Sequence, residues 1–126
     1  MLFRSNSSVV EVPAGCSAAS SCTSQTTVAS QQNNGLANPT GIAVGPTGNL
    51  YIADTGNNRV ILLPWTPSTN AYGAQKEIDS QLVGPEGVAL NAMGNVYIAD
   101  TGNNQVIKIT ESSGPARNRG GFRMRP

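Results

Sequence analysis

Histidine is absent from the 126 residues of this chain, and only 12% of them are charged. Without histidine, the chain can build neither a Ser-His-Asp or Cys-His nucleophile pair nor a zinc site with histidine ligands. No apolar run approaches the roughly 18 residues of a membrane-spanning helix. We therefore expect no catalytic residues, no metal ligands, no cofactor-binding residues and no membrane span.

Glycine, proline and small polar residues take the place of the missing charges, with 14 Gly and 8 Pro in the chain. A helical bundle needs much more Ala, Leu, Glu and Lys, so the composition favours a turn-rich, all-β protein. The formal net charge is +1, but four of the eight basic residues lie in the last ten positions, 117–126. The rest of the chain is mildly acidic, which argues against nucleic-acid binding along its surface.

Only two cysteines are present, Cys16 and Cys22, in the stretch GCSAASSC. Their spacing matches neither a CxxC redox motif nor half of a zinc site, which leaves a local disulfide or two free thiols. A disulfide would favour an extracytoplasmic or secreted location. The opening residues, MLFRSNSSVVEV, lack the apolar core of a secretory signal. We therefore expect that the beginning of a longer protein is missing, and the compartment stays open.

An internal repeat organises the chain. Residues 39–64 (PTGIAVGPTGNLYIADTGNNRVILLP) and 85–110 (PEGVALNAMGNVYIADTGNNQVIKIT) align without a gap at an offset of 46, with 15 of 26 positions identical. Each copy reads as a short apolar strand, a Gly-containing turn, a Tyr-Ile strand, a polar turn and a third strand. A weaker fourth strand is predicted at 72–80. Four short strands in about 45 residues are typical of a β-propeller blade.

The pattern P-x-G-[IV]-A-[VL]…G-N-[LV]-Y-I-A-D-T-G-N-N-x-V-I resembles the NHL repeat of bacterial tandem-repeat proteins. This resemblance is strong over 36–64 and 82–110 and implies a propeller, commonly of six blades. We expect an incomplete propeller of four-stranded antiparallel blades, about two blades plus a partial one. The predicted parts are a partial preceding blade with the cysteine loop (1–35), a first blade (36–81), a second blade without its outer strand (82–111) and a basic, disordered tail (112–126).

The polar turn that recurs in both copies supplies the most conspicuous side chains. Each aspartate is expected to cap its own turn by accepting backbone N–H bonds, while Gly and Asn allow positive φ. These predicted turn residues are Asp54, Gly56, Asn57, Asn58, Asp100, Gly102, Asn103 and Asn104. Trp65 and Arg59 are not reproduced in the second copy, so they are the candidates for contact with a partner.

The function that the sequence favours is a non-catalytic binding scaffold for a protein or a small ligand. Two alternatives are part of a propeller hydrolase or lyase with its catalytic residues outside this chain, and nucleic-acid binding through the basic tail. Two blades cannot close a ring, since closed propellers have about four to eight. The chain is therefore expected to be a fragment of a longer propeller, a self-associating blade pair such as a trimer, or a marginal open fragment.

Overall fold

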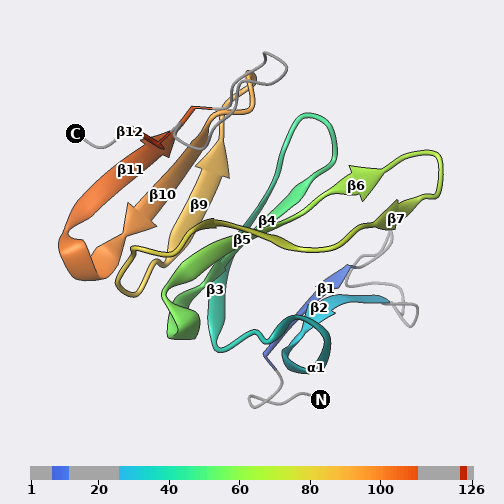
Figure 1. The fold of residues 1–126 in the computed structure, drawn as a ribbon, viewed down its shortest axis with the longest axis horizontal. Coiled ribbons are helices and arrows are strands. Elements are labelled where there is room, and N and C mark those ends of the chain that lie inside the picture. Colours follow the sequence, from blue (N-terminus) through green and yellow to red (C-terminus); the bar gives the residue numbers. More distant parts are fainter. Residues whose placement is uncertain (1–6, 12–25, 111–122, 125–126) are drawn as a thin grey trace, which may run out of the picture.

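The computed structural model describes residues 7–11, 26–110 and 123–124. Within these residues strands far outnumber helix, and they form two four-stranded antiparallel sheets and two two-stranded ones (Figure 1). The prediction of an all-β, incomplete propeller is confirmed, because the two four-stranded sheets stack as consecutive blades.

The first four-stranded sheet, blade 1, has the strand order β3-β4-β5-β8. Its strands are β3 (Pro39–Val44), β4 (Leu50–Asp54), β5 (Arg59–Leu63) and β8 (Lys76–Asp79). Every residue of β4 is buried, because this strand lies inside the sheet and is covered on both faces. A 3-10 turn, η1 (Thr55–Asn57), connects β4 to β5.

The second four-stranded sheet, blade 2, repeats this arrangement with the order β9-β10-β11-β12. Its elements are β9 (Gly87–Leu90), β10 (Val96–Asp100), the turn η2 (Thr101–Asn103), β11 (Gln105–Ile109) and β12 (Arg123–Met124). The sequence predicts no outer strand for this blade, and β12 corrects that prediction. A two-residue strand carries no periodicity that a sequence pattern could reveal.

A hairpin projects from blade 1 after β5. It is formed by β6 (Trp65–Thr66) and β7 (Ala71–Tyr72), which pair with each other in a separate sheet. The fourth strand expected at 72–80 is therefore shorter, because Tyr72 belongs to this hairpin and only Lys76–Asp79 pair with β5.

The remaining two-stranded sheet packs on the face of blade 1 opposite blade 2. It pairs β1 (Ser8–Glu11) with β2 (Thr26–Ser30), and the short helix α1 (Gln31–Asn34) follows. Ser30 caps α1 through its side chain, and Gly35 ends it in the left-handed conformation. Among the described residues no helix is long and apolar enough to cross a membrane.

The core consists of two apolar clusters, one on each face of blade 1. The first joins β1 and β2 to blade 1 through Val9, Ala29, Leu36, Leu50, Ile52, Ile61 and Leu63. The second joins blade 1 to blade 2 through Tyr51, Val60, Leu82, Val96, Ile98 and Ile107. Each fully buried isoleucine stabilises the fold by roughly 2 kcal/mol. Stacking of consecutive sheets therefore supplies the core that a single sheet lacks.

Close backbone contacts fix the linkers against the turns. The Gly56 amide donates to the Ala37 carbonyl and the Gly102 amide to the Val83 carbonyl, both at 2.7 Å. A Cβ on Gly102 would lie 2.5 Å from that Val83 oxygen and 2.3 Å from the Val83 Cγ1. A side chain at this position is therefore excluded by contact rather than by backbone conformation.

We expect Gly102→Ala to lower the free energy of unfolding by about 2 kcal/mol or more, because the linker must move away from the turn. Gly73→Ala is the matched control, since its Cβ would meet nothing closer than 3.6 Å. Urea unfolding followed by tryptophan fluorescence measures both. Equal midpoints for the two variants would contradict this account of the turn.

Candidate functional site

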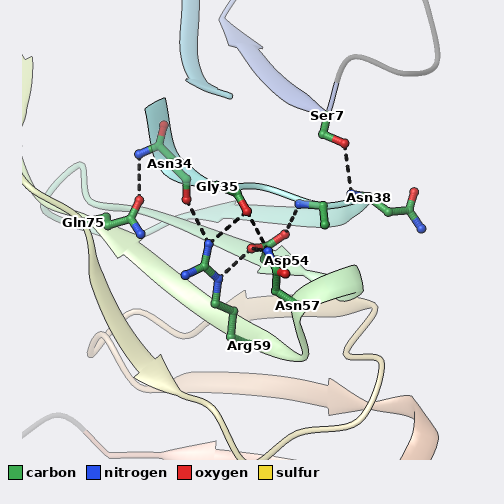
Figure 2. A network of polar contacts seen from close by, with 9 residues as sticks. Ser7, Asn34, Gly35, Asn38, Asp54, Asn57, Arg59 and Gln75 are labelled. Carbon is green, nitrogen blue, oxygen red and sulfur yellow. Dashed lines mark hydrogen bonds and ion pairs between the residues drawn. The ribbon is translucent and has the colours of Figure 1, made fainter. Parts of the chain in front are cut away.

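Asp54 ends β4 and is fully buried, with a carboxylate that binds three donors (Figure 2). Its Oδ1 accepts the backbone N–H of Ala37 at 2.7 Å. Its Oδ2 accepts Asn57 Nδ2 at 2.8 Å and pairs with Arg59 Nε at 2.7 Å. A buried charge is tolerated only when it is paired and hydrogen-bonded, and these contacts meet that requirement.

The two side chains that bind Asp54 also hold the segment before blade 1. Arg59 Nη2 donates to the carbonyl of Asn34 at 2.9 Å, and Asn57 Nδ2 donates to the carbonyl of Gly35 at 2.7 Å. Both carbonyls lie at the end of α1, where a helix leaves oxygens without an internal partner. The carboxylate and its donors therefore connect the turn after β4 to the linker that precedes the blade.

Blade 2 repeats this arrangement around Asp100, which is also fully buried. Its Oδ1 accepts the backbone N–H of Val83 at 2.7 Å. Its Oδ2 accepts Asn103 Nδ2 at 2.8 Å and Gln105 Nε2 at 2.9 Å. Gln105 thus replaces Arg59 with a neutral donor at nearly the same distance. We call each of these two sets of contacts, around Asp54 and around Asp100, an aspartate clasp.

The contacts of these aspartates differ from the role that the sequence suggests. Neither Asp54 nor Asp100 makes a side-chain cap bond to its own turn. Each instead reaches a backbone amide 17 residues earlier. The sequence signal for this partner is a second short repeat, Leu36–Pro39 (LANP) and Leu82–Pro85 (LVGP), in which the leucine is buried and the next residue donates the amide.

The other predicted turn residues lie at the clasps as well. Asn58 and Asn104 take left-handed conformations, with φ of 56° and 54°, and each donates its amide back to the first turn residue, Thr55 or Thr101. Asn58 Oδ1 also accepts the amide of Gly84 at 2.8 Å, so it joins the end of blade 1 to the linker before blade 2.

Trp65 contacts residues of its own blade. Its ring packs edge-to-face on Tyr72 with centroids 4.9 Å apart, and its amide donates to Asn49 Oδ1 at 2.8 Å. Burial, followed by the Glu11 carboxylate, raises the pKa of the Tyr72 phenol above its ordinary value. Gly48 makes room for the indole, because a Cβ there would lie 2.8 Å from Trp65 Cδ1.

In the described part of the chain, no three His, Cys, Asp or Glu side chains come close enough together to hold a metal ion. Cys16 and Cys22 lie outside the described residues, as does most of the basic tail, so the predicted disulfide and the tail's binding to nucleic acid stay predictions.

Arg59→Gln turns the first clasp into a copy of the second, so we expect a loss of only about 1 kcal/mol in the free energy of unfolding. Arg59→Met removes the donor altogether and leaves a buried carboxylate short of one partner. That variant is expected to lose about 3 kcal/mol or more. Chemical denaturation of both variants measures the difference. Equal losses would contradict the equivalence of the two clasps.

The NHL repeat profile matches this chain twice, at residues 36–61 and 82–109. These two matches contain the carboxylates of both clasps and the donors that bind them, the first two strands of each blade, all of β11 and the first three residues of β5. No curated protein is significantly similar to the chain in sequence.

Solved structures with a similar arrangement of strands include two larger proteins. Luciferin-regenerating enzyme superposes with a TM-score of 0.55 at 21% identity, over 69% of this chain and 29% of that protein. Regucalcin, a calcium-binding protein from Agrobacterium tumefaciens strain C58, gives a TM-score of 0.56 at 22% identity, over 68% of this chain and 30% of its own. The likeness extends to the fold, and this chain spans less than a third of either protein.

The comparison corrects one expectation from the sequence. The absence of histidine led us to expect that the chain is not an enzyme. That prediction is contradicted, because the same arrangement of blades occurs in luciferin-regenerating enzyme. The composition of a two-blade segment does not separate catalytic propellers from others, since function depends on the site and not on the fold.

The repeated pattern, the two stacked blades with their clasps and the two profile matches agree: this chain contains two NHL repeats, at residues 36–61 and 82–109.

Proposed function

We propose that this chain is a binding segment of a β-propeller, which holds a protein or a small ligand at one end of its two blades. We call this end the variable rim and define it by the turn before β4 (Gly45–Asn49), the turn before β10 (Asn91–Asn95) and the β6–β7 hairpin. Figure 1 shows both turns at the end of the blades opposite η1 and η2.

The observation that carries this proposal is a contrast between the two ends of the blades. At the end with the aspartate clasps, residues 54–58 and 100–104 are identical, and in each turn the aspartate binds the side chain of the first asparagine. At the variable rim the corresponding turns read GPTGN and NAMGN, and blade 1 carries the β6–β7 hairpin beside its turn. A scaffold that keeps its structural contacts constant and varies its loops is a common way to build a binding surface.

The chemistry of the variable rim favours an uncharged or apolar partner. None of the residues in the two turns is charged. Met93 is 79% exposed, and the space beside it is open, because a Cβ on Gly94 would meet nothing within 4 Å. Methionine adapts its shape to apolar partners. We therefore expect binding through packing and backbone hydrogen bonds, with little dependence on salt.

Peptides selected from a random display library against the full chain test this proposal. We expect the selected peptides to bind at least about tenfold more weakly to Met93→Asp, because a carboxylate at the contact must be desolvated. Val106→Asp is the matched control: this valine is 59% exposed and lies on the flank of blade 2, away from the variable rim. Its affinity is expected to stay within about twofold of the unaltered chain.

The affinity of the same peptides is expected to change little between low and high salt, because salt screens only interactions between charges. Selected peptides that lose affinity in Val106→Asp but not in Met93→Asp would contradict the proposal.

A further inference from the structure

The two-stranded sheet β1–β2 packs against blade 1 in the same way as β5 and β8, the outer strands of blade 1, pack against blade 2. Val9 of β1 is buried in the first core cluster, as Val60 of β5 is buried in the second. Both strand pairs also carry a register shift at the same place, after Val9 and after Val60. A shared bulge at matching positions indicates the same structural unit.

The linkers before blade 1 and before blade 2 also form equivalent hydrogen bonds. The amide of Asn38 donates to Ser7 Oγ at 3.1 Å, just as the amide of Gly84 donates to Asn58 Oδ1. Asn38 and Gly84 are 46 residues apart and have nearly the same left-handed φ, 55° and 57°. Ser7 thus takes the place before β1 that Asn58 takes before β5.

One part of the unit has no counterpart among the described residues. In blade 1, β5 pairs with β8 on one edge and with β4 on the other. In the part of the chain that the structure describes, β1 pairs with β2 alone. No described strand covers its other edge, whose backbone donors and acceptors are of the kind that can take another strand.

An apolar surface lies beside this edge. Ile42 is 52% exposed and Val44 is 63% exposed, although both belong to a strand of the core sheet. Their equivalents in blade 2, Val88 and Leu90, are packed against the second cluster under blade 1. A groove of about 290 Å³ runs between the two sheets, lined by residues 8–10 and 39–42.

We propose that the edge of β1 that no described strand covers, together with Ile42 and Val44, is an acceptor site for a β-hairpin of the NHL inner-strand type. We choose this occupant because β3 and β4 of blade 1 cover the equivalent surface of blade 2. The buried Tyr51 of β4 lies in the cluster between the two blades. Such a hairpin adds its second strand to β1 and packs its tyrosine on Val44, which completes a third four-stranded blade. Addition of a strand at a sheet edge is an established mode of recognition. This site is separate from the variable rim.

A synthetic, fluorescently labelled peptide with the sequence of residues 39–54, the inner hairpin of blade 1, tests the acceptor site. Fluorescence anisotropy with the full chain is expected to show saturable binding at one peptide per chain. The same peptide with Ser in place of Tyr51 is expected to bind at least about tenfold more weakly, because it loses the aromatic contact.

Variants of the chain locate the binding. Val44→Asp is expected to weaken binding of the unaltered peptide at least about tenfold, while Val106→Asp, similarly exposed on the opposite flank, stays within about twofold. Ile42→Asp serves as a second variant if Val44→Asp does not fold, as judged by its urea midpoint. No binding by the unaltered chain up to millimolar peptide, or equal binding by Val44→Asp, would overturn the proposal.

Sedimentation of the chain without peptide completes the test. A monomer that binds the peptide supports the proposal. An oligomer that Val44→Asp dissociates would show a second copy in the site and would overturn the assignment to a separate hairpin.

Discussion

A buried carboxylate must have donors, and in this chain that requirement ties each blade to the segment before it. Asp54 and Asp100 are fully buried where the second strand of each blade ends. The amides that bind them come from Ala37 and Val83, 17 residues earlier. Because an unpaired charge in this position would cost several kcal/mol, the linker is held against the turn in both blades. The direction in which each blade starts is thus set by the end of its own second strand.

The clasps also explain why the two ends of the blades behave differently. At the clasp end, Asn57 and Asn103 bind the aspartates, and Gly102 approaches the Val83 carbonyl too closely for any side chain. The turns at the opposite end carry none of these duties, so blade 1 can add a hairpin with Trp65 stacked on Tyr72, and blade 2 can expose Met93. The binding role that we propose therefore lies at the end where the fold tolerates change.

Much of this architecture was predictable from the repeat. The 46-residue offset and the strands around Tyr51 and Tyr97 are local patterns, and the confirmed fold follows from them. Two features were not predictable. Strand β12 is two residues long and carries no pattern. The donors to Asp54 and Asp100 are main-chain amides, which any residue supplies, so only the short repeats at 36–39 and 82–85 point to them. The absence of histidine, in turn, was a poor guide to catalysis, because a fold of this kind also serves an enzyme.

The sequence by itself determined the period, the strands and the identity of the turn residues, because these depend on alternation, β-propensity and tolerance of positive φ within a few neighbours. Only the tertiary structure decided which valines are core and which are surface. Val60 and Val106 occupy the same position in the two aligned repeats, yet one is fully buried and the other 59% exposed. The difference lies in whether another sheet covers that face, and stacking between sheets is not encoded in the local pattern of either repeat.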